Sequence, residues 1–180
     1  ASGAVLEVGA GTGANLAYYP PSAEKIALVE PDPHMRRRLD RAVRRMPSRE
    51  RFEVHEGDAS ALPFAAGSFD TVVTTLLLCS VPEASRALEE IARVLRPEGQ
   101  LLYLEHIAAP LGSSLRRLQE RVEPFWKHIA GNCHVTRSTL ESIEGAGLVP
   151  MYPRAEEMRR APPWIRPTIR GCAVKPAMSA

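Results

Sequence analysis

The stretch that decides the fold is Ala4-Val5-Leu6-Glu7-Val8-Gly9-Ala10-Gly11-Thr12-Gly13, a short apolar run that ends in three alternating glycines. The apolar run predicts a β-strand. Glycines at alternate positions let the backbone turn sharply and approach a ligand without interference from a Cβ atom. A helical turn predicted from Ala14 toward Tyr18 would point its backbone N–H groups at that ligand. The stretch therefore predicts a strand, a tight turn and a helix start that hold a ligand between them.

Strands and helices alternate along the rest of the chain. Further strands are predicted from short apolar runs at 25–30, 51–55, 69–77, 100–104, 148–154 and 168–174. Helices are predicted from apolar residues at helical spacing at 33–46, 84–95, 114–125 and 136–147. Pro124 is expected to kink or end the third helix, and Thr136 to cap the fourth. This alternation predicts an α/β fold, with a mostly parallel sheet covered by helices on both faces.

Composition limits the class of protein. A chain of 180 residues with 44% hydrophobic and 24% charged residues predicts one soluble globular domain, and excludes a disordered or membrane-spanning chain. The formal net charge of +2 does not indicate a nucleic-acid partner. Cys79, Cys133 and Cys172 are too few and too scattered to predict a disulfide framework or a zinc site, so we expect no metal. Because the chain opens at Ala1 without Met, we expect an upstream segment to be missing.

Acidic residues follow the second and third predicted strands, at the edge of a parallel sheet where ligands bind. Glu30, 21 residues after Gly9, can accept hydrogen bonds from both hydroxyls of a ribose and would repel a 2′-phosphate. Asp58 can accept a hydrogen bond from an adenine amino group. These residues favour an adenine nucleotide. Since Gly9-x-Gly11-x-x-Ala14 also fits the dinucleotide fingerprint, NAD remains open at this point.

Four motifs in order resemble the class I S-adenosylmethionine-dependent methyltransferases. They are Glu-x-Gly-x-Gly-x-Gly at 7–13, Glu30, Gly-Asp-Ala at 57–59 before Leu-Pro-Phe at 62–64, and Arg-Pro-Glu-Gly at 96–99, where Glu98 replaces the usual Gly. A narrower resemblance, to the methyltransferase-like protein 7 family, rests on 78–81, 105–108, 123–129 and 132–137, which include Trp-Lys-His-Ile at 126–129. Animal members of that family are membrane-associated thiol S-methyltransferases.

The resemblance implies a Rossmann-like three-layer methyltransferase fold, with a seven-stranded sheet in the order 3-2-1-4-5-7-6 and an antiparallel last strand. It implies a single methyltransferase domain over residues 1–180 whose N-terminal helical segment is missing. The implied reaction is methyl transfer from S-adenosylmethionine, which leaves S-adenosylhomocysteine, to a small acceptor, in the first place an alkyl thiol. Phospholipid N-methyltransferases and quinone-type C-methyltransferases share most of the motifs, and both remain alternatives. A non-catalytic module that binds adenosyl nucleotides is another.

Site residues follow from these motifs. The residues expected to bind the cofactor are Glu7, Gly9, Gly11, Thr12, Gly13, Asn15, Glu30, Pro31, Asp58, Ala59, Thr75 and Leu76. The residues expected to contact the acceptor are Cys79, Trp126 and Cys133. His106 and His128 are the catalytic candidates, because a neutral imidazole can take the proton of a thiol that is mostly un-ionised at neutral pH.

We expect a monomer in the cytoplasm that acts on a small-molecule acceptor and binds no nucleic acid. A membrane-associated form, held by a peripheral contact of the missing N-terminal segment, also stays open.

Overall fold

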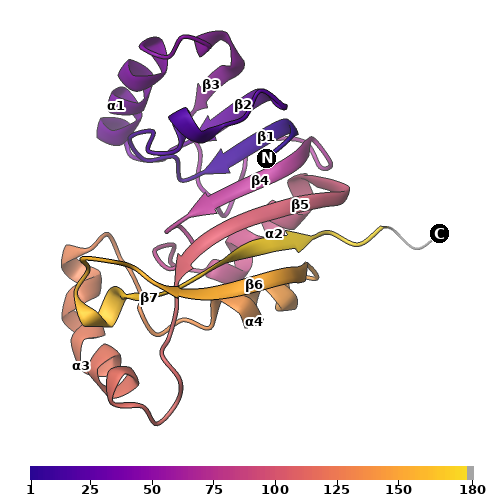
Figure 1. Ribbon diagram of the computed structural model, residues 1–180. Helices are drawn as coiled ribbons and strands as arrows, with labels where there is room; N and C mark the ends of the chain where they lie inside the picture. The colour runs from indigo at the N-terminus through magenta and orange to yellow at the C-terminus, as the bar shows by residue number, and fades with distance from the viewer. Residues whose placement is uncertain (178–180) are drawn as a thin grey trace.

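The centre of the molecule is a seven-stranded sheet in the order β3-β2-β1-β4-β5-β7-β6 (Figure 1). The structure, a computed structural model, describes residues 1–177. The strands are β1 (Gly3–Val8), β2 (Ala23–Val29), β3 (Phe52–His55), β4 (Phe69–Thr75), β5 (Leu95–His106), β6 (Val149–Glu157) and β7 (Pro167–Val174). The first five strands in this order, β3, β2, β1, β4 and β5, run parallel to their neighbours. The strand β7 runs antiparallel to both β5 and β6. The strand order and directions implied by the resemblance are confirmed.

Helices cover the sheet from both faces. The helices of the chain are α1 (Pro33–Arg44), α2 (Ala84–Val94), α3 (Ser114–Ile129) and α4 (Thr139–Gly145), with short 3₁₀ turns η1 (Leu16–Tyr18), η2 (Arg49–Arg51) and η3 (Pro163–Ile165). Of these, α1, α2 and α4 cover the sheet, whereas α3 packs against η3. Leu39 and Val43 of α1 belong to one buried cluster with β1, β2 and β3, and α2 and α4 belong to a second cluster on the opposite face. Within residues 1–177, no helix has both the length and the apolar composition needed to cross a membrane.

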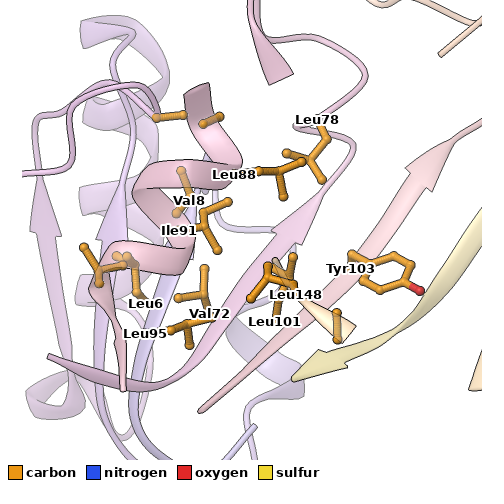
Figure 2. Close-up of a cluster of buried hydrophobic side chains, with 14 of the residues drawn as sticks. Leu6, Val8, Val72, Leu78, Leu88, Ile91, Leu95, Leu101, Tyr103 and Leu148 are labelled. Carbon is orange, nitrogen blue, oxygen red and sulfur yellow. The ribbon is translucent and has the colours of Figure 1, made fainter. Parts of the chain in front are cut away.

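Alternate residues of the central strands point to opposite faces, and this alternation holds the layers together. Val5 packs into the cluster under α1, while its neighbour Leu6 packs into the cluster under α2. Figure 2 shows Leu88 and Ile91 of α2 directed at the side chains of the strands. Each of these fully buried side chains contributes roughly 1.5–3 kcal/mol through burial of its apolar surface. Because β1 also pairs with β4 in parallel, the loops after these two strands leave the same edge of the sheet.

The third helix differs from its prediction. α3 continues through Pro124 to Ile129, so the expectation that Pro124 ends the helix is wrong, while the alternative of a kink there stays a prediction. Tertiary contacts hold the helix on both sides of the proline. Gln119 is fully buried, with its side chain bonded to the backbone of Ile107, Ala109 and Trp164. After the proline, Trp126 packs edge-to-face on Trp164 at 5.7 Å between ring centroids. These contacts outweigh the local preference of proline to end a helix.

The fourth helix begins later than predicted. α4 starts at Thr139, with Ser138 at its N-cap position, so Thr136 does not cap it. The backbone N–H and the hydroxyl of Thr136 both donate to the Glu123 carboxylate instead, at 2.8 and 2.6 Å. Thr136 therefore ties the segment after α3 back to α3 itself.

Candidate active site

A cavity of about 460 Å³ lies at the carboxyl ends of the central strands. It sits between β1 and β4, where the order of the strands reverses, which is the usual ligand position in open α/β sheets. The residues that line it are Val8, Gly9, Gly11, Val29, Glu30, Pro31, Asp32, Met35, Gly57, Asp58, Ala59, Leu76, Leu77, Ser80, Val81, Pro82, Ala130 and Gly131. Its size suits a nucleotide-sized ligand. Seven of the predicted cofactor residues therefore meet in one cavity.

Two glycines give the loop after β1 its shape. Gly9 has a φ of +72°, and a Cβ atom there would lie 2.6 Å from the Leu77 side chain. Gly11 has a φ of +57°, but a Cβ atom there would meet nothing within 4 Å. Gly9 thus lets the loop pack closely against the segment after β4, whereas Gly11 leaves open space on the cavity side. A ligand can approach the backbone at Gly11 closely.

Glu30 places a carboxylate at the cavity wall. Its side chain is only 5% exposed, and its two oxygens accept hydrogen bonds from the backbone N–H groups of Gly11 (2.8 Å) and Asp32 (3.0 Å). A carboxylate can accept about four hydrogen bonds. One acceptor position per oxygen therefore remains, which fits a pair of neighbouring hydroxyl groups such as those of a ribose.

Asp58 faces the same cavity from the loop after β3. Its Oδ1 atom accepts hydrogen bonds from the hydroxyl and the backbone N–H of Ser60, and these bonds lower the pKa of Asp58 below its usual value. Among residues 1–177, no hydrogen bond reaches Oδ2. An ionised carboxylate with one free oxygen suits an amino group of a ligand.

A second group of predicted cofactor residues lies under the glycine loop, outside the cavity lining. The buried Glu7 carboxylate accepts hydrogen bonds from Asn15 (2.8 Å) and Tyr19 (2.6 Å), and Asn15 also donates to Thr75 at 3.0 Å. Burial raises the pKa of Glu7, although these hydrogen bonds oppose the rise. Asn15 and Thr75 line a neighbouring hollow of about 180 Å³, while Thr12 and Gly13 line neither space. The group ties the loop to β1 and β4.

Most of the residues predicted to contact or activate the acceptor form a third group, and none of the predicted five lines the cavity. The Cys133 Sγ atom lies 3.3 Å from His106 Nδ1 and 3.8 Å from Cys79 Sγ, and all three residues are buried. Trp126 packs against the same cluster. His128 does not join it: the residue is exposed on α3, with Nδ1 2.7 Å from the Pro124 carbonyl oxygen. The structure thus brings four of the five predicted acceptor-side residues together.

Two further residues shape the loop after β4, and sequence reasoning missed both as site residues. Glu105 is fully buried and accepts hydrogen bonds from the backbone N–H groups of Leu77 and Cys79, each at 3.2 Å. Burial and the nearby Cys79 raise the pKa of Glu105 to about 8. Arg137 donates to the carbonyl oxygens of Leu78 and Pro82. An acidic residue next to His106 at the end of an apolar strand was the available signal for Glu105.

Comparison with known proteins agrees with this geometry. The family described as "Methyltransferase domain" matches residues 6–103. Human thiol S-methyltransferase TMT1B is 41% identical over 178 residues, covering 96% of this chain and 70% of the relative, and human TMT1A is 35% identical over 175 residues, covering 95% and 70%. The crystal structure of a SAM-dependent methyltransferase from Methanosarcina mazei superposes with a TM-score of 0.78 at 21% identity, covering 98% of this chain and 93% of that one. The chain therefore belongs to the methyltransferase domain family and, within it, to the family of the thiol S-methyltransferases.

Proposed function

We propose that this enzyme transfers the methyl group of S-adenosylmethionine to the sulfur of a small thiol. One observation carries the choice of a thiol. The match to the methyltransferase domain ends at residue 103, whereas the similarity to the thiol S-methyltransferases covers 96% of the chain. It therefore extends over His106, Trp126 and Cys133, which the sequence predicts on the acceptor side. Lipid and quinone methylation are supported only by relatives that match 61% of this chain or less.

The side chains and the backbone that line the cavity match the chemical groups of the cofactor. When bound, S-adenosylmethionine supplies an electrophilic methyl group carried by a sulfonium sulfur. Glu30 would accept hydrogen bonds from the two ribose hydroxyls through its remaining acceptor positions. Asp58 would accept from the adenine amino group through Oδ2, and the open backbone at Gly11 would leave room for the ligand. Glu7, Asn15 and Thr75 would act as positioning residues from beneath the loop.

The acceptor would enter on the side of the cavity formed by the loops after β4 and α3. Leu76, Leu77, Val81 and Ala130 present apolar groups there. Direct methyl transfer needs the acceptor sulfur held in line with the methyl carbon and shielded from water, and such positioning supplies most of the acceleration. The chain's contribution is thus a shaped, mostly apolar pocket. That His106 or His128 removes the proton of the thiol remains a prediction from the sequence.

A product assay tests the proposal. The protein is incubated with methyl-labelled S-adenosylmethionine and, separately, alkyl thiols, ethanolamine lipids and quinols. We expect labelled S-methyl thioethers from the thiols, and a large loss of product with the Glu30→Ala variant. Label found only in the lipid or quinol would overturn the choice of a thiol. Cofactor binding without product from any acceptor would instead identify a non-catalytic binding module.

A further inference from the structure

The buried cluster of Cys79, His106 and Cys133 has a geometry that methyl transfer does not require. Its members come from three separate segments, namely the loop after β4, the end of β5 and the loop after α3. Their Sγ and Nδ1 atoms all lie within 4.8 Å of one another. The scattered cysteines gave no metal motif in the sequence, but the fold brings two of the three together with an imidazole. The fold therefore gathers three potential metal-ligand atoms at one buried point.

The distances in the cluster match those between ligands of a tetrahedral zinc ion. Zinc–sulfur bonds of about 2.3 Å and zinc–nitrogen bonds of about 2.05 Å, at tetrahedral angles, put two sulfurs about 3.8 Å apart and a sulfur and a nitrogen about 3.6 Å apart. The two Sγ atoms lie 3.8 Å apart, and His106 Nδ1 lies 3.7 Å from Cys79 Sγ and 3.3 Å from Cys133 Sγ. Shifts of a few tenths of an ångström would complete the coordination.

A disulfide fits the same atoms less well. A sulfur–sulfur bond is about 2.05 Å long, so the two sulfurs, now 3.8 Å apart, would have to approach by about 1.8 Å in a buried, well-packed region. Zinc requires no such movement. The donor set also selects the metal, because thiolate sulfur with imidazole nitrogen suits zinc and excludes magnesium or calcium, which prefer oxygen ligands.

Charge balance favours a divalent cation in this buried cluster. Cys79, His106 and Cys133 are all buried, so a lone charge on any of them would be poorly solvated. Two thiolates, one neutral imidazole and one divalent cation sum to zero. The filled site would therefore place no net charge in the protein interior.

We propose that Cys79, His106 and Cys133 bind a zinc ion. Three protein ligands leave one tetrahedral position for water or a small ligand. The ion would tie the loop after β4, which lines the cavity, to β5 and to the segment after α3. With its Nδ1 atom bound to the metal, His106 serves as a ligand there and not as a base. The site does not depend on which acceptor the enzyme methylates.

Cobalt titration of the reduced, metal-free protein tests the proposal directly, because Co²⁺ replaces zinc and gives thiolate-to-cobalt charge-transfer absorption. The reductant is a phosphine, which adds no competing thiol. We expect one Co²⁺ per chain with these bands, and their loss when one equivalent of Zn²⁺ is added. The unmodified protein provides this result without any substitution. Absence of charge-transfer absorption at saturating Co²⁺ would overturn the proposal.

Variants locate the site. Cys79→Ser and Cys133→Ser should each weaken Zn²⁺ binding by more than about 100-fold in competition with a chromophoric chelator, since loss of an outer partner alone costs 10–100-fold. Cys172→Ser is the matched control, because Cys172 lies on β7 and its Sγ atom contacts Gln100 instead. It should bind Zn²⁺ like the unmodified protein. The assignment would be contradicted if all three variants lost Zn²⁺ affinity equally, or if Cys79→Ser and Cys133→Ser lost none. Circular dichroism establishes that each variant is folded.

Discussion

The Glu30 carboxylate anchors the glycine loop and also lines the proposed ribose-binding position. Both of its oxygens already accept a backbone N–H, so the group is fixed in place before a ligand arrives. We expect Glu30→Ala to weaken S-adenosylhomocysteine binding by about 1.5–3 kcal/mol, the range for hydrogen bonds to a charged group. Isothermal titration calorimetry measures the difference. Glu24→Ala is the control, because Glu24 is exposed on β2 and does not line the cavity. Equal affinities for Glu30→Ala and the unmodified protein would remove Glu30 from the site.

Gly11 and Gly67 allow backbone strain to be separated from cavity filling. Both have positive φ, +57° and +66°, and an added Cβ atom would meet nothing within 4 Å at either position. Alanine at either should cost about 1–2 kcal/mol of stability. Only Gly11 lines the cavity, so only Gly11→Ala should also weaken S-adenosylhomocysteine binding. Urea denaturation and calorimetry on both variants give the comparison. If Gly67→Ala lost as much affinity, strain and not the cavity would explain the effect.

At the scale of elements, the Glu90–Arg93 pair on α2 anchors the loop that carries Asp58. Glu90 accepts hydrogen bonds from Arg93 and from the backbone N–H of Leu62, and Arg93 donates to the carbonyl oxygens of Leu62 and Phe64. The bonds from Arg93 are the main reason why the pKa of Glu90 lies below its ordinary value of 4.5, although burial opposes the shift. The carboxylate therefore stabilises the folded protein above that value, and this contribution is lost as the pH falls through the lower folded pKa.

Glu90→Gln tests this anchor. We expect it to lower the free energy of unfolding by about 1–2 kcal/mol at pH 7, a range reduced for the partial exposure of Arg93. The difference from the unmodified protein should shrink below about pH 4.5, the usual pKa of the group. Urea denaturation at several pH values measures it, with the exposed Glu89→Gln as control. If the difference in the free energy of unfolding stayed constant below pH 4.5, the charge of Glu90 would not be its cause.

The elements that sequence predicted best are those whose signals are local. The Asp32 cap and Pro33 at the first turn placed the start of α1, because the capping side chain bonds backbone N–H groups two and three residues away. The helix end predicted at Pro124 and the helix cap predicted at Thr136 are wrong because their signals are not local. Contacts with distant residues, Trp126 on Trp164 and Thr136 on Glu123, decide those boundaries, and no short window of sequence contains both partners.

At the scale of the whole molecule, alternating strands and helices predicted a mostly parallel sheet but not its strand order. The order came from the motif resemblance, because periodicity does not say which strands are neighbours. The carboxylates of Glu30 and Asp58 were predictable since both follow strands whose ends share one edge. The cluster of Cys79, His106 and Cys133 was not, because residues separated by 27 or more positions meet only once β4, β5 and α3 are in place.

The cavity also predicts how a ligand changes global stability. Its walls come mainly from the loops after β1, β2, β3 and β4, and Val8 and Val29 in the lining belong to the core under α2. A ligand there contacts several strands at once and should oppose unfolding of the sheet as a unit. S-adenosylhomocysteine at 100 times its dissociation constant should add about 2.7 kcal/mol, roughly 5–10 °C in melting temperature for a chain of this length. NAD at the same concentration should shift the melting temperature little, and Glu30→Ala should reduce the shift given by S-adenosylhomocysteine. Thermal denaturation with each ligand measures both effects, and stronger stabilisation by NAD would mean that the glycine loop and Glu30 serve a dinucleotide.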